Sequence, residues 1–404
     1  MHTIDQPIAI LGGGPAGMAA ALSLIAAGHR AVIYERYPQA RPGGNILNLW
    51  PPPIKALEAM GVDIVDLGAP CHTTFRNAKG RIRADVRIPA DVVERYGGGF
   101  IGMLRPDLYR RMLAAMPDGV LQTGRTVTDI RNHGDGVTLT FAEGDTVETP
   151  VLIGADGIDS TVRRHLFGDI PKRPHDLHII GGFTFDDTVV TERNEVVLTH
   201  NRTTQGTYTS IRSQGRDGHQ WWVLEAWPDS KEPPADLHAH AAALADGFPA
   251  PLPQLVAATP AENLQRWPIR DIAPLAHWSK GRITLAGDAA HATSPYAAYG
   301  AGMSICDGYF LGQRLAGVDL SDTDAVTAAL VAYETPRIPH TREQVQSAWM
   351  LGKLFHHAPA ALRPLRDFVL DHTPLLQKQV GERNPVQIVA QLDEMGSGIV
   401  GLPA

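Results

Sequence analysis

The chain has 404 residues, enough for two or three packed units, and 44% of them are apolar, as a protein with a sizeable core requires. Its 36 basic and 43 acidic side chains give a net charge of −7, which offers no basic footprint for binding nucleic acid. The two cysteines, Cys71 and Cys306, are too few for a disulfide framework. There is no run long and apolar enough to suggest a membrane span and no signal-peptide pattern, so we expect a cytoplasmic protein.

The N-terminal region has the pattern of a dinucleotide-binding unit. Within residues 7–27, a short apolar run precedes a glycine-rich turn and an alanine-rich, helix-like stretch. Gly12, Gly14 and Gly17 stand where the chain must turn tightly, approach a pyrophosphate and pack helix against strand. A second apolar run ends in Glu35, whose carboxylate can accept hydrogen bonds from a ribose hydroxyl. Because strand, glycines, helix, strand and acid agree, we predict that a dinucleotide binds at the helix start.

Two later apolar runs also end in an acidic turn. The first leads into Asp156-Gly157, a pair that by itself favours a structural Asx turn. The second leads into Gly287-Asp288, where the carboxylate can accept a hydrogen bond from a sugar-chain hydroxyl. Between the first two acidic elements, residues 126–141 have the pattern of a β-hairpin.

Taken together, the motifs resemble those of the single-component FAD-dependent aromatic hydroxylases, the family of para-hydroxybenzoate hydroxylase and the tetracycline-inactivating monooxygenases. The matching stretches are GGGPAG with Glu35-Arg36, then Arg105, then GADGIDSTVRR, then GDAAHATSPYAAYGAG with Asp307 beyond it. They occur in the family's order over roughly residues 5–350. The resemblance implies an α/β fold, with a Rossmann-like FAD-binding domain, an inserted β-rich substrate domain and C-terminal helices. The expected boundaries are 1–70, 100–177 and 270–325 for the FAD domain, 71–99 and 178–269 for the substrate domain, and 326–404 for the helices.

The resemblance also implies roles for single residues. It assigns cofactor binding to Gly12, Gly14, Ala16, Gly17, Glu35, Arg36, Arg105, Val127, Asp156, Asp288, Gly300, Ala301 and Gly302. In this set the first glycines face the FAD diphosphate, Glu35 the adenosine ribose and Asp288 the ribityl chain. Asp156 matches a motif that serves both FAD and the reduced nicotinamide nucleotide. Pro295 matches the proline beside the flavin ring, and with Tyr296 and Gly300 it forms the loop to which we assign catalysis.

Two positions of this loop depart from the family pattern. The usual Pro-x-x-Gly-x-Gly-x-Asn becomes a segment with Ala298 in place of a glycine and Gly302 in place of the asparagine. If the backbone at Ala298 requires a positive φ, the alanine is strained there. The change at Gly302 removes a side-chain amide from the expected surroundings of the flavin.

The chemistry that the resemblance implies is oxygen insertion. NADPH or NADH reduces FAD, the flavin reacts with O₂ to form a C4a-hydroperoxide, and one oxygen atom enters an electron-rich aromatic or polyketide-like molecule. Because no second glycine fingerprint follows the first, NAD(P)H is expected to dock transiently. Epoxidation, Baeyer–Villiger insertion, flavin-dependent reduction and a non-catalytic flavoprotein remain open alternatives. Halogenation is disfavoured because the chain lacks the Trp-x-Trp-x-Ile-Pro signature.

The substrate wall is expected in the β-rich stretch from about 178 to 270. If one face of its sheet covers the flavin, the candidate substrate residues are Phe183, Tyr208, Arg212 and Trp222. Trp221 and Trp222 are adjacent on a strand and must point to opposite faces. The spacing of His238 and His240 on a helix makes a metal site there unexpected. We interpret His291 as a structural donor and expect a monomer or a homodimer.

Overall fold

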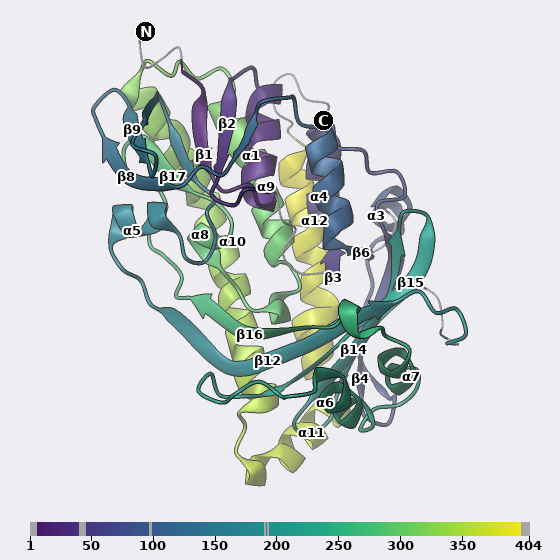
Figure 1. Ribbon diagram of the computed structural model, residues 1–404. Coiled ribbons are helices and arrows are strands. Elements are labelled where there is room, and N and C mark those ends of the chain that lie inside the picture. The colour runs from purple at the N-terminus through teal and green to yellow at the C-terminus, as the bar shows by residue number, and fades with distance from the viewer. Residues whose placement is uncertain (1–5, 40–45, 97–98, 190, 192–193, 397–404) are drawn as a thin grey trace.

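The computed structural model describes residues 6–39, 46–96, 99–189, 191 and 194–396. Within these residues, a parallel sheet of five strands lies at the top of Figure 1, in the order β17-β11-β1-β2-β7. The strands are β1 (Ile8–Leu11), β2 (Ala31–Glu35), β7 (Leu121–Thr123), β11 (Leu152–Gly154) and β17 (Ile283–Leu285). The helix α1 (Pro15–Ala26) connects β1 to β2. Strands β1 and β2 are apolar because both faces of the sheet are covered. In β1, Ile8, Ala9 and Ile10 have no exposed surface.

The predicted β-hairpin is confirmed. Strands β8 (Val127–Asn132) and β9 (Val137–Phe141) pair antiparallel, and β10 (Thr146–Thr149) adds a third strand. The small sheet precedes β11, so the chain returns to the parallel sheet directly after it.

A second, larger sheet crosses the middle of the molecule and has nine strands among the described residues. Its main path follows the order β16-β12-β15-β14-β13-β4-β6-β3, and β5 pairs with β4. Its strands are β3 (Ile46–Leu49), β4 (Ala69–Asn77), β5 (Ile82–Val86), β6 (Phe100–Leu104), β12 (Lys172–Thr184), β13 (Glu195–His200), β14 (Gln205–Ser213), β15 (Arg216–Ala226) and β16 (Gln265–Ile272). Strands β3, β6 and the start of β12 thus join the β-rich part although their residues were expected in the FAD domain, and the exact boundaries stay a prediction.

Each face of the larger sheet has its own cover. Helices α6 (Leu237–Ala245) and α7 (Leu252–Ala257) pack on one face against Trp221 and Tyr208, which are buried in an apolar cluster. The other face looks toward the parallel sheet (Figure 1). Consecutive side chains of a strand point to opposite faces of the sheet, so only every second side chain of each strand faces the parallel sheet and is available to a ligand.

Helices fill the space between and below the two sheets. Those of the first half are α2 (Pro51–Ala59), α3 (Ala90–Tyr96), α4 (Arg105–Ala114) and α5 (Thr161–Phe167). Those after the larger sheet are α8 (Asp288–His291), α9 (Gly300–Leu315), α10 (Thr323–His356), α11 (Arg363–His372) and α12 (Arg383–Met395), with a π-helical turn at Gln377–Glu382. The 34-residue α10 extends from α9 past the larger sheet to α11 (Figure 1). Among the described residues, no helix combines the length and the apolar character needed to cross a bilayer.

Candidate active site

A cavity of about 1420 Å³ lies between the two sheets. Gly14, Arg105 and Asp288 line it on the side of the parallel sheet, and Trp222 and His200 line it on the side of the larger sheet. Residues far apart in sequence therefore meet at one space, as ligand sites at the carboxyl ends of parallel strands commonly do.

The glycine turn after β1 is closely packed and open only toward the cavity. Gly12 has φ of 105°, and a Cβ on it would lie 2.3 Å from the carbonyl oxygen of Ala155. A Cβ on Gly17 would lie 2.0 Å from the carbonyl oxygen of Gly12, so no larger residue fits at either position. A Cβ on Gly14 would meet nothing within 4 Å, and Gly14 lines the cavity together with Ala16. This is the shape that a diphosphate at the start of α1 requires.

Glu35 lies behind this turn. Its Oε2 accepts a hydrogen bond from the Gly13 amide at 2.7 Å, and its Oε1 accepts one from the Tyr37 amide at 2.9 Å. The carboxylate is thereby held at the end of β2. Arg36 is exposed, with its guanidinium 5.0 Å from the Tyr37 ring centroid, and Val127 begins β8; neither residue lines the cavity.

Asp288 and Arg105 form a charged edge of the cavity. Each stands at the first position of a helix, α8 and α4 respectively. No hydrogen bond joins the Asp288 carboxylate or the Arg105 guanidinium to another described residue. Burial lowers the pKa of Arg105, and the charge of Asp288 opposes that shift. Two polar groups that face a cavity without partners fit a ligand that carries hydroxyl and phosphate groups, as FAD does.

Asp156 has a different environment. Its carboxylate accepts hydrogen bonds from the Ser160 hydroxyl and from the Thr161 amide at 2.6 Å, at the start of α5. Burial raises its pKa, and these hydrogen bonds oppose the rise. The carboxylate is committed to the turn, as the Asx-turn interpretation implies, whereas its neighbours Ala155 and Gly157 line the cavity.

The loop after α8 borders the cavity with backbone and aromatic groups. Pro295–Ala297 forms a 3₁₀ turn, and Ala298 follows with φ of 47° and ψ of 22°. The alanine therefore occupies the left-handed region that the family pattern reserves for glycine. The loop residues that line the cavity are Pro295, Tyr296, Ala298, Tyr299, Gly300 and Ala301. Gly302 is absent from this lining and faces Tyr299 and Pro53 instead.

On the larger sheet, only Trp222 of the four candidate substrate residues lines the cavity. Trp222 is paired with Thr207, whereas Tyr208 is paired with Trp221. Because directly paired residues share a face, Tyr208 and Trp222 lie on opposite faces, and Tyr208 is buried under α6 and α7. The placement of Tyr208 therefore contradicts the expectation of a substrate contact.

Arg212 and Phe183 also lie elsewhere than expected. Arg212 donates to Asp217 at 2.8 Å and to Asp66 at 3.1 Å at the end of the β14–β15 hairpin. Phe183 lies near the end of β12, with its ring centroid 5.8 Å from that of Phe185. Neither residue lines the cavity, because the sequence did not show where along the sheet the cavity ends.

The structure adds wall residues that the sequence did not single out. They share the face of Trp222 and comprise Thr73, Phe75, Ile179, Val196, Leu198, His200, Gln205, Leu224 and Trp267. The alternation of β14 predicts that Gln205 and Thr207 share a face, but the choice of that face needed the pairing with Trp222. The sequence held no signal for His200, because its role depends on strand β4 beside it.

His200 is a buried polar group of this wall that has no hydrogen-bond partner among the described residues. Its ring stacks on Phe355 with centroids 3.8 Å apart, and the Tyr296 ring lies 6.3 Å away at 18° to it. No hydrogen bond joins either ring nitrogen to the described residues, and Nε2 is a buried atom without a partner. Burial holds the pKa of His200 well below its usual range, and the positive charges of Arg83 and Arg366 add to that effect. The imidazole is therefore neutral and has unused hydrogen-bonding capacity.

One group of side chains outside the cavity has metal-ligand chemistry. Among the described residues, His178, Glu225 and His240 bring their ligand atoms within 4.8 Å of one another. Arg266 Nε, which can only donate, lies 2.7 Å from His178 Nδ1. His178 Nδ1 therefore accepts, and the protonated Nε2 donates to Glu225 at 3.0 Å. These bonds orient His178 as a donor to Glu225 rather than as a metal ligand.

The parallel βαβ sheet and the glycine turn lie at one large cavity together with Asp288, which has no hydrogen-bond partner among the described residues. These features define a dinucleotide-binding protein. A family model described as an FAD binding domain matches residues 5–348. The chain is 32% identical over 373 residues to 3-amino-4-hydroxybenzoate 2-monooxygenase of Streptomyces platensis, covering 89% of this chain and 91% of that protein. It is 31% identical to 6-hydroxynicotinate 3-monooxygenase of Bordetella bronchiseptica, covering 82% and 87%.

A solved structure is similar over almost the whole chain. The Klebsiella pneumoniae protein HpxO, in complex with FAD and uric acid, superposes with a TM-score of 0.81 at 23% identity, covering 98% of this chain and 97% of that one. This likeness shows the shared fold. Together with the sequence matches, it establishes that the chain belongs to the FAD binding domain family and is an FAD-dependent monooxygenase, with NAD(P)H as reductant and O₂ as co-substrate.

Proposed function

We propose that this enzyme hydroxylates a small, electron-rich aromatic ring held between the Tyr296 loop and the wall around Trp222. The observation that supports this most directly is the continuity of the cavity, which joins the Asp288–Arg105 edge to a wall of apolar and aromatic side chains. The two relatives named above act on a hydroxylated benzoate and a hydroxylated pyridine carboxylate, and this chain covers most of both proteins.

The residues of the parallel-sheet side fit the cofactor. We propose that Gly12, Gly14 and Gly17 receive the diphosphate and that Asp288 accepts hydrogen bonds from the ribityl hydroxyls. We propose that Arg105 offsets the negative charge of the cofactor, because its guanidinium has no hydrogen-bond partner among the described residues at this edge. Bound FAD supplies the electron transfer from NAD(P)H and the activation of O₂.

The residues of the larger sheet fit the substrate. Ile179, Leu198, Trp222 and Leu224 offer a dry apolar surface to a flat ring. His200, uncharged and without a partner, is proposed to bind one polar substituent of that ring, because occupancy would satisfy its buried nitrogen. A ring bound against this apolar wall is shielded from bulk water on that side.

The test is the fate of labelled oxygen. Purified holoenzyme is incubated with NADH or NADPH under ¹⁸O₂ and a panel of ring acids that includes 3-amino-4-hydroxybenzoate and 6-hydroxynicotinate. The expected result is a hydroxylated product that carries one heavy oxygen atom from O₂ and none from labelled water. If both oxygen atoms of O₂ are recovered as hydrogen peroxide with every ring acid tested, the enzyme does not hydroxylate this class of substrate. A lactone or an epoxide as product would show that the enzyme inserts oxygen by a reaction other than hydroxylation.

Cofactor placement is tested separately with Asp288→Ala. Loss of the carboxylate is expected to lower the FAD content of the purified protein, measured from the ratio of flavin to protein absorbance. The matched control is Asp319→Ala, which changes an exposed loop carboxylate that bonds only within its own turn. Full FAD content in Asp288→Ala would remove the ribityl assignment.

A further inference from the structure

The loop that faces the cavity is tied to the end of α10 by one directed chain of hydrogen bonds. The Tyr296 hydroxyl bonds to Nε2 of His356, and Nδ1 of His356 lies 2.8 Å from the carbonyl oxygen of Thr203. Because a carbonyl can only accept, Nδ1 carries the proton and Nε2 accepts from Tyr296. His356 thus holds Tyr296 on one side and the β13–β14 connection on the other.

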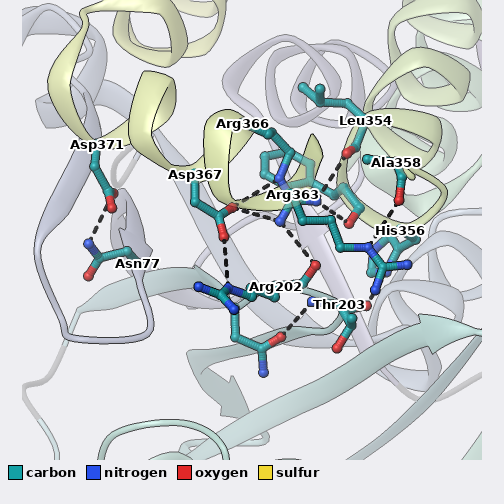
Figure 2. A network of polar contacts seen from close by, with 12 residues as sticks. Asn77, Arg202, Thr203, Leu354, His356, Ala358, Arg363, Arg366, Asp367 and Asp371 are labelled. Carbon is teal, nitrogen blue, oxygen red and sulfur yellow. Dashed lines mark hydrogen bonds and ion pairs between the residues drawn. The ribbon is translucent and has the colours of Figure 1, made fainter. Parts of the chain in front are cut away.

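The guanidinium of Arg366 holds both segments that these hydrogen bonds join, the end of α10 and the β13–β14 connection. Arg366 of α11 donates through Nη1 to the carbonyl oxygens of Leu354 at 3.2 Å and Phe355 at 2.7 Å, in the last turn of α10. Its Nη2 donates to the carbonyl oxygen of Arg202 at 3.0 Å, one residue before Thr203. Figure 2 shows the Arg366 side chain between the helix end and the Arg202–Thr203 segment.

The same guanidinium is itself held in place. Arg366 Nε donates to the Asp367 carboxylate at 2.9 Å, and Arg366 is only 8% exposed. Asp371, one turn beyond Asp367 along α11, accepts from Asn77 at 3.0 Å (Figure 2). It also accepts from Arg83 at 2.7 Å. Helix α11 is therefore attached to three strands of the larger sheet or to their connections, and it has little freedom to shift. A rigid support of this kind is what a precisely placed loop needs.

We propose that His356 and Arg366, which lie beyond the residues matched by the family model, are positioning residues for the loop that faces the flavin. They set the place of Tyr296, and through it the turn Pro295–Ala297, relative to the bound cofactor. The inference rests on the proposed placement of the flavin beside this turn. Without these hydrogen bonds, the strained backbone at Ala298 can relax, and the loop then moves away from the cavity.

The test compares two neighbouring histidines in purified holoenzyme. His356→Leu is expected to change the visible circular dichroism of bound FAD and to weaken FAD binding about tenfold, since the loop loses a buried hydrogen bond that holds it in place. His356→Gln keeps a donor for Thr203 and an acceptor for Tyr296, so it is expected to restore the wild-type spectrum. The control is His357→Leu, which loses a bond of 2.8 Å to the His175 carbonyl but has no contact with Tyr296.

A second pair covers the case in which His356→Leu does not fold. Tyr296→Phe removes one hydroxyl and is expected to give the same spectral change as His356→Leu. Arg366→Lys is expected to give the same spectral change, because a lysine cannot bond to both segments at once. The control is Arg363→Lys, which is expected to keep the wild-type spectrum. Among the described residues, the Arg363 side chain bonds only to the carbonyl oxygen of Ala358, at 3.0 Å. Melting temperatures measured on the same samples separate local from global effects.

The outcomes distinguish this inference from the proposed function. If Asp288→Ala weakens FAD binding but the His356 and Tyr296 variants leave the spectrum and the affinity unchanged, the positioning role is wrong and the cofactor site stands. If Asp288→Ala also leaves FAD binding unchanged, the placement of the cofactor is wrong. A fall in melting temperature in His356→Leu with an unaltered flavin spectrum likewise overturns the positioning role.

Discussion

The carboxylate of Asp307 lies 2.6 Å from Nε2 of His291, and neither side chain reaches the surface. The same carboxylate accepts from the Gly287 amide at 2.8 Å and from Arg337 Nε at 2.9 Å. Burial raises the pKa of Asp307, but the attraction of His291 and Arg337 outweighs it and holds the pKa below its usual value. One buried anion thus ties α9 and α10 to the turn that carries Asp288, and His291 acts as the structural donor expected from the sequence.

Asp307→Asn tests this support. The variant leaves Arg337 as a buried cation without its counter-charge, a loss that typically costs about 3–5 kcal/mol. We expect a lower free energy of unfolding and a lower FAD content, measured by urea denaturation and by flavin absorbance. Asp322→Asn serves as the control, because that exposed carboxylate caps α10 and lies outside this network. Equal stability of the Asp307→Asn and Asp322→Asn proteins would show that the network is not required.

Gly302 replaces the asparagine of the family pattern, and the structure provides a reason. A Cβ at Gly302 would lie 2.7 Å from two ring carbons of Tyr299. The Tyr299 ring lies against Trp50 with the ring centroids 4.9 Å apart and the planes tilted by 30°, and its hydroxyl bonds to Gln391 of α12. The glycine therefore makes room for a tyrosine that joins the loop to the C-terminal helix.

Gly302→Asn is accordingly expected to destabilise the protein, by about 1–3 kcal/mol for a forced shift in a packed site. Tyr299→Leu alone loses the contacts with Trp50 and Gln391 and is also expected to destabilise. Because leucine removes the ring that asparagine would strike, the double variant should lose less than the sum of the two single losses. Additive losses in urea denaturation would show that the two positions are independent.

Ala298→Gly tests the strain in the flavin-facing loop. A left-handed alanine costs about 1–2 kcal/mol relative to its ordinary conformations, and glycine avoids most of that cost. We expect the variant to unfold at a higher urea concentration, with FAD content preserved. The control Ala301→Gly, in the first turn of α9 where φ is helical, should not stabilise. A less stable Ala298→Gly protein would contradict the strain.

The pH dependence of stability follows from the buried imidazoles. Burial lowers the pKa of His356 to about 4, whereas the unfolded chain titrates near 6.5. Between these values the unfolded state binds more protons than the folded state, so stability falls as pH falls, by about 3 kcal/mol for His356 over the whole window. His200 adds to the slope in the same direction.

His356→Gln should therefore flatten the stability profile between pH 6.5 and pH 4, measured by urea denaturation at several pH values. The exposed His372, changed to glutamine, is expected to leave the slope unaltered. A wild-type profile that is flat through this window would show that the folded protein protonates these histidines at little cost.

The local units of this protein can be predicted from its amino-acid sequence alone. The βαβ start, the hairpin over 126–141 and the acid turns at Asp156 and Asp288 are short-range patterns, in which glycine geometry and apolar runs act within about 30 residues. They were enough to predict a bound dinucleotide, and the family resemblance that they carry implied FAD, in agreement with the family model. They also located Gly14, Arg105, Asp288 and Tyr296, all of which line the cavity.

The face of each strand that borders the cavity, and the distant residues that complete the site, became known only from the folded structure. The alternation of side chains along each strand allows either Tyr208 or Trp222 to face the cavity. The pairing of Tyr208 with Trp221 places Tyr208 and Trp222 on opposite faces of the sheet. His200, His356 and Arg366 acquire their roles from strands and helices up to 164 positions away in the sequence. Strand register and helix docking arise from the burial of the whole core, so no local pattern contains them.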